Sequence, residues 1–207
     1  MTVKIGCIVE GHGDVVAVPL LILRIAAELH PDMGIETPRP IRVHRNQVIQ
    51  ADKLEQRVEL AARRIGGQGA ILIILDADDD CPAQLGPELL NRASQARSDL
   101  PIAVVLAKYE FEAWFLAAAE SLRGQRELRN NIQAPNDPET IRGAKEWLSR
   151  QMEGTRRYSE RFDQPALAAF FDMEQARQAV SFDKCYRDIT RLLNELRQAM
   201  EATHENV

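Results

Sequence analysis

Cysteine is scarce in this chain, and the scarcity excludes two kinds of architecture. The three cysteines, Cys7, Cys81 and Cys185, lie far apart, and no two of them form a Cys-x-x-Cys pair. Disulfide frameworks and structural zinc sites both depend on sets of suitably spaced cysteines. We therefore expect neither a disulfide scaffold nor a zinc-binding segment.

Long apolar runs and an excess of positive charge are also missing. The longest apolar stretches cover residues 15–23 and 70–75, and a membrane span needs roughly 18 residues. No secretory signal precedes the first predicted strand, so we expect a cytoplasmic protein that does not enter a membrane. The net charge is −5, so the overall balance gives no sign of nucleic-acid binding.

The chain does have the composition of a folded domain and a regular alternation of strand and helix. Apolar residues make up 45% and charged residues 28% of the sequence, which is typical of globular proteins and excludes disorder. Short apolar segments predict strands at residues 3–9, 41–43, 70–75 and 102–106. Amphipathic segments between and after them predict helices at residues 14–30, 51–65, 82–97 and 110–119.

This alternation predicts an α/β fold, with a parallel sheet of about four strands and helices on its faces. We assign residues 1–122 to this domain, with Asp14 as the N-cap of its first helix. After residue 122 the pattern becomes helical. Residues 123–207 are therefore expected to form a helical extension, packed on or beside the sheet.

Acidic residues follow two of the predicted strands. Glu10 ends the first strand, and Asp76 and Asp78 end the strand at residues 70–75. The carboxyl ends of parallel strands share one edge of a sheet, where ligands bind. Residues two apart on an extended segment face the same side, so Asp76 and Asp78 are expected to converge with Glu10.

Three converging carboxylates repel one another, and a divalent cation relieves that repulsion. Their hard oxygen atoms suit Mg²⁺ or Mn²⁺. The alternative is a solvated acidic turn, which is how we interpret Asp79 and Asp80. Glu10 lies at the end of a separate strand and beside glycines, which favours a metal site formed by Glu10, Asp76 and Asp78.

The order of these motifs resembles the Toprim domain of topoisomerases, primases and OLD-type nucleases. The resemblance depends on Glu10-Gly11 after the first strand and on Asp76-Ala77-Asp78 after a later one. The whole chain looks closer still to a small, uncharacterised Toprim-like family of standalone bacterial proteins. The further matching motifs are Glu110-Phe111-Glu112-Ala113-Trp114-Phe115-Leu116 and, near the end, Ser181-Phe182. We expect Ser181 to cap the last helix and Phe182 to pack in the core.

The resemblance implies a role for each matching residue. Glu10 would be a metal ligand or general base, and Asp76 and Asp78 would be ligands of Mg²⁺ or Mn²⁺. Glu112 would complete the metal site. Lys145 would contact phosphate or the leaving group. One departure concerns the residues after Glu-Gly, where many family members carry a Thr-Glu-like pair and this chain has His-Gly-Asp.

Three further residues have open alternatives. Lys108 follows the strand at residues 102–106 and either neutralises a phosphate or is a paired surface charge. His12 is either a ligand or an exposed loop histidine. Glu110 and Glu112 are two residues apart, so on a helix only one of them reaches the metal, unless the turn is irregular.

The expected function is metal-dependent phosphoryl transfer by a nuclease that cleaves nucleic acid, and the resemblance implies a role in phage defence. The resemblance also implies an alternative, a subunit that depends on a partner ATPase and has little activity alone; a homodimer is also open. A receiver domain or a phosphatase fits less well, because the phosphatase class places its Asp-x-Asp after the first strand. The sequence leaves open DNA versus RNA, strandedness and the number of metal ions.

Overall fold

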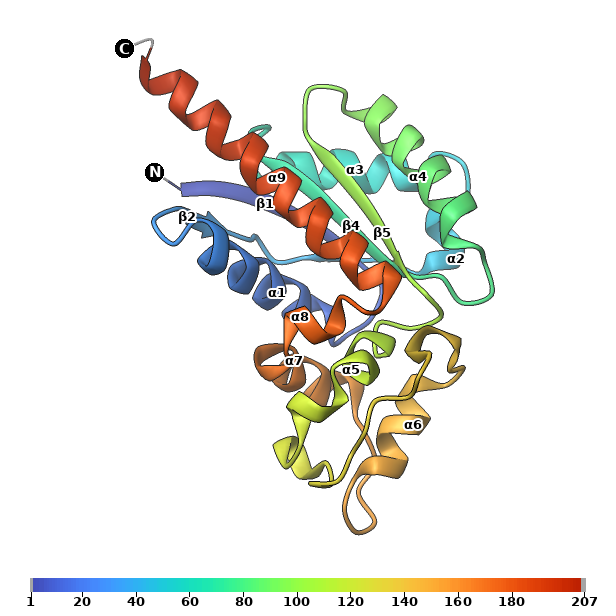
Figure 1. The fold of residues 1–207 in the computed structure, drawn as a ribbon. Helices are drawn as coiled ribbons and strands as arrows, with labels where there is room; N and C mark the ends of the chain where they lie inside the picture. Colours follow the sequence, from blue (N-terminus) through green and yellow to red (C-terminus); the bar gives the residue numbers. More distant parts are fainter. Residues whose placement is uncertain (1, 206–207) are drawn as a thin grey trace.

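A parallel β-sheet forms the centre of the protein in a computed structural model that describes residues 2–205 (Figure 1). The strands follow the order β2-β1-β4-β5, and β3 lies alongside β1. All the pairings between these strands are parallel. The strands are β1 (Thr2–Val9), β2 (Gly34–Glu36), β3 (Ile41–Arg42), β4 (Ala70–Asp76) and β5 (Ile102–Ala107). The predicted α/β fold class is confirmed.

Strand β4 shows why these segments form a sheet buried on both sides. Its alternate residues Ala70, Leu72 and Ile74 enter one apolar core. The residues between them, Ile71, Ile73 and Leu75, enter a second core on the opposite face. A side-chain period of two residues places consecutive apolar residues on opposite faces, so an uninterrupted apolar run is stable only between two helical layers.

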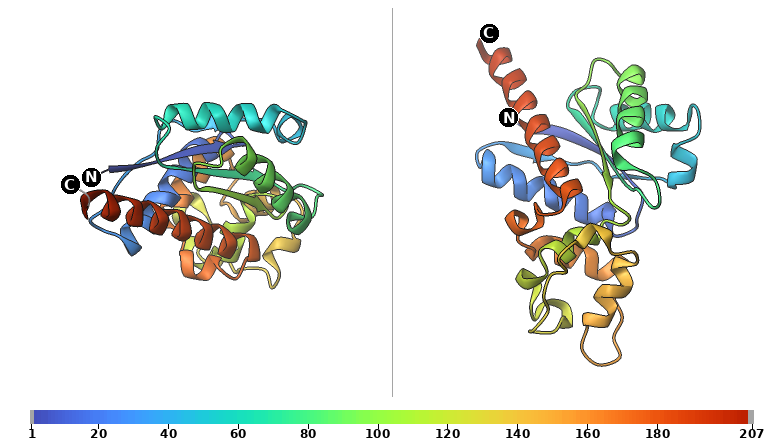
Figure 2. Two further views of the ribbon diagram at one scale, coloured as in Figure 1. Left: turned by 90° about the horizontal axis from the view of Figure 1, so that it is seen from above. Right: turned by 45° about the vertical axis from the view of Figure 1, so that its right-hand side comes forward.

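Helices supply those two layers (Figure 2). One face is covered by α1 (Asp14–Leu29) and α9 (Val180–Glu205), and the other by α3 (Lys53–Arg64) and α4 (Pro82–Ala96). Among the described residues, none of the helices has both the length and the apolar character needed to cross a membrane.

Helix α9 also covers the edge strand β5. Lys184 Nζ donates a hydrogen bond to the carbonyl oxygen of Val104 at 2.8 Å, and Arg191 Nη2 donates to that of Ile102 at 2.8 Å. These donors satisfy carbonyl groups that an open sheet edge would present to another chain. The C-terminal helix therefore returns to the sheet, whereas the predicted boundary at residue 122 stays a prediction.

The segment between β5 and α9 forms a lobe of short helices below the carboxyl edge of the sheet in Figure 1. An aromatic cluster joins this lobe to helix α9: Trp114 and Phe171 each lie edge-on to Phe182, with ring centroids 5.3 and 5.4 Å apart. The helices are α5 (Ala113–Ala117), α6 (Ala144–Gln151), α7 (Glu160–Phe170) and α8 (Met173–Ala176), with 3₁₀ turns at Ala119–Leu122, Gln125–Glu127 and Pro138–Thr140.

Two capping predictions were wrong. Gly13, not Asp14, is the N-cap of α1, and Asp14 is its first helical residue. Ser181 lies inside α9, which begins at Val180, and its hydroxyl accepts a hydrogen bond from Trp114 Nε1 at 2.8 Å. The packing prediction for Phe182 is confirmed, because its side chain is fully buried.

The remaining differences concern short elements. Strand β2 and helix α2 (Arg45–Val48) have three and four residues, too few to show a periodic pattern. The helix expected at residues 110–119 is reduced to α5, because Tyr109 has a φ of 61° and the chain turns before it.

Candidate functional site

The candidate site lies where the sheet changes its winding direction. From β1 the chain passes to β2 and β3 on one side, and then to β4 on the other. Glu10 follows β1 and Asp76 ends β4, so both acids stand at the carboxyl ends of neighbouring strands, at a topological switch point. They line a pocket of about 350 Å³. Five carboxylates contribute to its wall: Glu10, Asp14, Asp76, Glu112 and Glu160.

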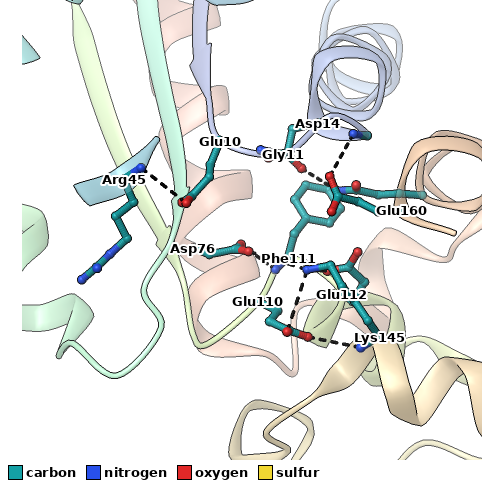
Figure 3. Close-up of polar contacts among 12 residues, drawn as sticks. Glu10, Gly11, Asp14, Arg45, Asp76, Glu110, Phe111, Glu112, Lys145 and Glu160 are labelled. Atoms are coloured by element: carbon teal, nitrogen blue, oxygen red, sulfur yellow. Dashed lines mark hydrogen bonds and ion pairs between the residues drawn. The ribbon is translucent and has the colours of Figure 1, made fainter. Parts of the chain in front are cut away.

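Glu10 has one satisfied and one unsatisfied carboxylate oxygen (Figure 3). Its Oε1 accepts a weak hydrogen bond from the backbone N–H of Arg45 at 3.4 Å. Its Oε2 is buried and makes no hydrogen bond to any described residue. Burial raises the pKa of Glu10, and the nearby Asp78 carboxylate adds to this, although backbone N–H groups oppose it. A buried oxygen without a donor is costly, so this position favours a ligand that a carboxylate can bind.

Asp76 lies between the backbone of Phe111 and the side chain of Lys145. Its Oδ1 accepts a hydrogen bond from the backbone N–H of Phe111 at 2.8 Å, and its Oδ2 lies 3.8 Å from Lys145 Nζ. Burial raises the pKa of Asp76 well above its ordinary value; Lys145 opposes this, and the Glu112, Asp14 and Glu10 carboxylates add to it. The carboxylates of this pocket thus repel one another.

Glu112 and Lys145 form a buried ion pair beside Asp76. The Glu112 side chain is 1% exposed, and its Oε2 lies 3.0 Å from Lys145 Nζ. The Tyr158 hydroxyl donates a hydrogen bond to Glu112 Oε1 at 2.9 Å. Burial raises the pKa of Glu112 to about 7, even though Lys145 opposes the shift. Burial alone would lower the pKa of Lys145, but the Glu112, Asp76 and Glu110 carboxylates outweigh it and raise that pKa.

Glu110 reaches the same lysine from an irregular turn. Its Oε1 lies 3.9 Å from Lys145 Nζ, and its Oε2 accepts a hydrogen bond from the Lys145 backbone N–H at 3.2 Å. Glu112 is the N-cap of α5, and Glu110 precedes the helix. Both glutamates therefore contact Lys145, which a regular helix would not allow.

Two predicted site residues do not join the pocket. Asp78 was expected to face the same side as Asp76, but its φ of 48° turns the chain out of the extended conformation. Its side chain is 62% exposed and lies 3.6 Å from Arg45 Nη1. Lys108 points elsewhere, with its Nζ 4.3 Å from the ring centroid of Tyr109. The expected convergence of Asp76 and Asp78 is therefore wrong, because the strand ends at Asp76.

Sequence reasoning missed the residues of α7 that hold the glycine turn after β1. Asp14 Oδ2 accepts a hydrogen bond from the Gly11 backbone N–H at 2.7 Å, and its Oδ1 accepts one from Gln164 Nε2. Glu160 Oε1 accepts a hydrogen bond from the Gly13 backbone N–H at 3.2 Å. A Cβ atom at Gly13 would overlap the Gln164 amide and the Glu160 carbonyl oxygen, which explains the glycine. No local pattern signals contacts between residues about 150 positions apart.

The carboxylate oxygens of this pocket suit a divalent cation, although they are not arranged around a single position. Within residues 2–205, no three His, Cys, Asp or Glu side chains are placed so as to hold one ion together. The Glu10 and Asp76 carboxylates come from neighbouring strands, which lie about 5 Å apart in any sheet. Hard carboxylate oxygens, one of them buried without a donor, are the ligands that Mg²⁺ and Mn²⁺ prefer.

Comparison with known proteins identifies a family without assigning an activity. No curated protein and no solved structure matches the chain. One family model does match, over residues 9–190, and its description names no reaction and no relation to the Toprim domain. The match covers both acidic strand ends, the lobe and the first part of α9. The chain therefore belongs to the family described as a domain of unknown function, DUF4276.

Proposed function

We propose that this protein is a metal-dependent phosphodiester hydrolase acting on nucleic acid. The observation that carries the proposal is the pairing of Glu10 and Asp76 at the switch point of the sheet. They share their pocket with Glu112 and Lys145. Ligands of open α/β sheets bind at this position. The excess of carboxylates over cations favours a metal ion as the first ligand.

Glu10 and Asp76 would hold a Mg²⁺ or Mn²⁺ ion. When bound, such an ion stabilises negative charge on a phosphate and on the oxygen atoms that attack or leave it. The unpaired Oε2 of Glu10 supports this assignment, because it needs no rearranged hydrogen bond to become a ligand. Among the described residues, no backbone N–H group donates a hydrogen bond to the Oδ2 of Asp76, and its neighbour is the ammonium group of Lys145.

The chain's own residues would supply the remaining chemistry. Beside the ion, the Glu10 carboxylate would orient an attacking water and accept its proton. Lys145 offers a positive charge to a phosphate that enters beside Asp76. The Glu112 carboxylate positions this lysine, and the Tyr158 hydroxyl positions Glu112.

Cleavage assays with one matched pair of variants test this proposal. Wild-type protein, Asp76→Asn and Asp79→Asn would be incubated with supercoiled plasmid, linear duplex, single-stranded DNA and transfer RNA. Each reaction would contain Mg²⁺, Mn²⁺ or a chelator. Asp79 is a suitable control, because it lies in the same acidic segment but pairs with Arg142 outside the pocket.

We expect cleavage that requires metal, survives Asp79→Asn and falls at least about 100-fold in Asp76→Asn, the scale of losing one electrostatic catalytic group. Cleavage that persists in Asp76→Asn or in chelator would refute the assignment. Calorimetric titration with Mn²⁺ gives a second readout, because Asp76→Asn should lose the binding that Asp79→Asn retains.

A second candidate function is a subunit that needs a partner, such as an ATPase, to become active. Exposed apolar side chains on the C-terminal half favour it. Phe162 and Phe170 on α7 are 65% and 57% exposed, and Val180 at the start of α9 is 74% exposed. Large exposed apolar residues often mark protein interfaces. A protein that binds Mn²⁺ through Asp76 but cleaves nothing alone would support this candidate, and a fully active monomer would contradict it.

A further inference from the structure

A rim of one arginine and two histidines borders the acidic pocket on the side of β3. Arg42 is the last residue of β3, His44 follows two positions later, and His12 lies in the glycine turn after Glu10. All three side chains are exposed and line the same pocket as Glu10 and Asp76. Their neighbours Ile41 and Val43 are buried, so the alternation of an extended segment turns Arg42 and His44 to the same side.

Arg42 is not engaged in holding the fold together. Its guanidinium forms no ion pair and no hydrogen bond with the part of the chain that the structure describes. The nearby Arg45 is the opposite case: it is buried and forms ion pairs with Asp78 and Asp80. An exposed guanidinium with all its donors unused is suited to bidentate recognition of a phosphate group.

The rim and Lys145 lie on opposite sides of the acids. Arg42, Glu10 and Asp76 stand at the ends of β3, β1 and β4, and β1 pairs with both of the other strands. Two strand spacings separate β3 from β4, or about 10 Å. Lys145 lies on the far side, in contact with Asp76 and Glu112. Cations thus flank the acids on both sides, and Arg42 stands one strand spacing, about 5 Å, from the strand that carries Glu10.

We propose that Arg42, together with His44 and His12, binds the phosphate next to the scissile one in a single-stranded nucleic acid. This inference rests on the proposed function, because it extends that pocket to a polymeric substrate. A single strand fits better than a duplex for two reasons. The acids are recessed, with Glu112 only 1% exposed, so the backbone must bend to enter. The net charge of −5 leaves little basic surface for a rigid duplex.

The experiment measures binding in chelator, where metal-dependent cleavage cannot occur. Fluorescein-labelled oligo(dT) and oligo(U) strands, and a duplex of equal length, would be titrated with wild type, Arg42→Gln and Arg39→Gln by fluorescence anisotropy. Arg39 is a matched control, because it is exposed, lies three residues before Arg42 and lines a different pocket. His44→Glu is a second rim variant at an exposed position.

We expect Arg42→Gln to weaken strand binding about tenfold, the effect of losing one charge-assisted contact. The slope of log affinity against log salt should fall by about 0.7, as for one phosphate contact on a single strand. His44→Glu should weaken binding as well, and Arg39→Gln should leave it unchanged.

Four outcomes would overturn the inference: no effect of Arg42→Gln and His44→Glu, an equal effect of Arg39→Gln, tighter binding of the duplex, or no binding of strands by wild type. The proposed function fails separately, when Asp76→Asn leaves cleavage and Mn²⁺ binding intact. Thermal unfolding of each variant checks the fold, and the exposed, unpaired Arg42 predicts an unchanged melting temperature for Arg42→Gln.

Discussion

The ion pair between Lys145 and Glu112 should make stability depend on pH in a way that Lys145→Met exposes. The Glu112 side chain is 1% exposed and lies 3.0 Å from the lysine ammonium group. Removing one partner of a buried pair leaves the other charge uncompensated and costs about 3–5 kcal/mol. The neighbouring Asp76 carboxylate loses the same cation. We therefore expect Lys145→Met to lower the free energy of unfolding by about 2 kcal/mol at about pH 8.

The pH sets an upper limit on this loss, because Glu112 can be protonated instead. The ordinary pKa of a glutamate is 4.5, and each pH unit above it costs about 1.4 kcal/mol for a group that stays neutral. For a Glu112 that stays neutral this cost is about 5 kcal/mol near pH 8 and about 1 kcal/mol near pH 5.5, and the wild type, with its folded pKa of about 7, already bears about 3 kcal/mol of it at pH 8. The destabilisation by Lys145→Met should therefore shrink as the pH falls.

The sign of the wild-type dependence follows from the same group. The pKa of Glu112 in the folded protein is raised to about 7, so the folded state binds its proton more tightly than the unfolded state does. Its contribution to stability is complete below the unfolded pKa and is lost as the pH rises toward 7. In Lys145→Met the pKa of Glu112 in the folded state rises further, so the loss of stability with rising pH should continue to higher pH.

Urea denaturation followed by circular dichroism measures these effects at about pH 5.5 and pH 8. The double variant Lys145→Met, Glu112→Gln is the matched control, because an amide retains the hydrogen bond from Tyr158 without a charge. It should recover most of the loss at the higher pH. A Lys145→Met protein as stable as wild type at high pH, or equally destabilised at both pH values, would refute this account of the pocket.

Two further predictions concern the lobe and its junction with the sheet. Asp163→Asn should lower the free energy of unfolding by about 3 kcal/mol, because the buried Asp163 carboxylate pairs with Arg126 at 2.9 Å and with Arg156; a change below about 1 kcal/mol in urea denaturation would contradict the network. Gly13→Ala should displace α7 from the glycine turn, since the added methyl group overlaps Glu160. Faster amide hydrogen exchange in α7 would show this, and unchanged exchange would count against it.

Much of the sheet follows from local patterns. The uninterrupted apolar segments at Ala70–Asp76 and Ile102–Ala107 could only be strands between two helical layers, and their parallel order follows from the helices between them. The convergence of Glu10 with Asp76 follows from the same order, because the carboxyl ends of parallel strands share an edge. Asp78 could not be placed in this way, because a single residue at a φ of 48° changed its direction.

The rest of the site was beyond local reasoning. Tyr158 and Gln164 have no sequence feature that marks them. Gln164 meets Asp14 because α7 packs on the first helix, and Tyr158 meets Glu112 from the segment that precedes α7. Arg42 became notable only when the structure showed it unpaired beside the pocket.

The sequence by itself thus determined the α/β class and the edge at which the acids gather, because side-chain periodicity and strand order act over short distances. Tertiary structure decided which acids face one pocket, which of them Lys145 neutralises and which cations remain free. Those choices depend on contacts between residues far apart in the chain and on single backbone angles.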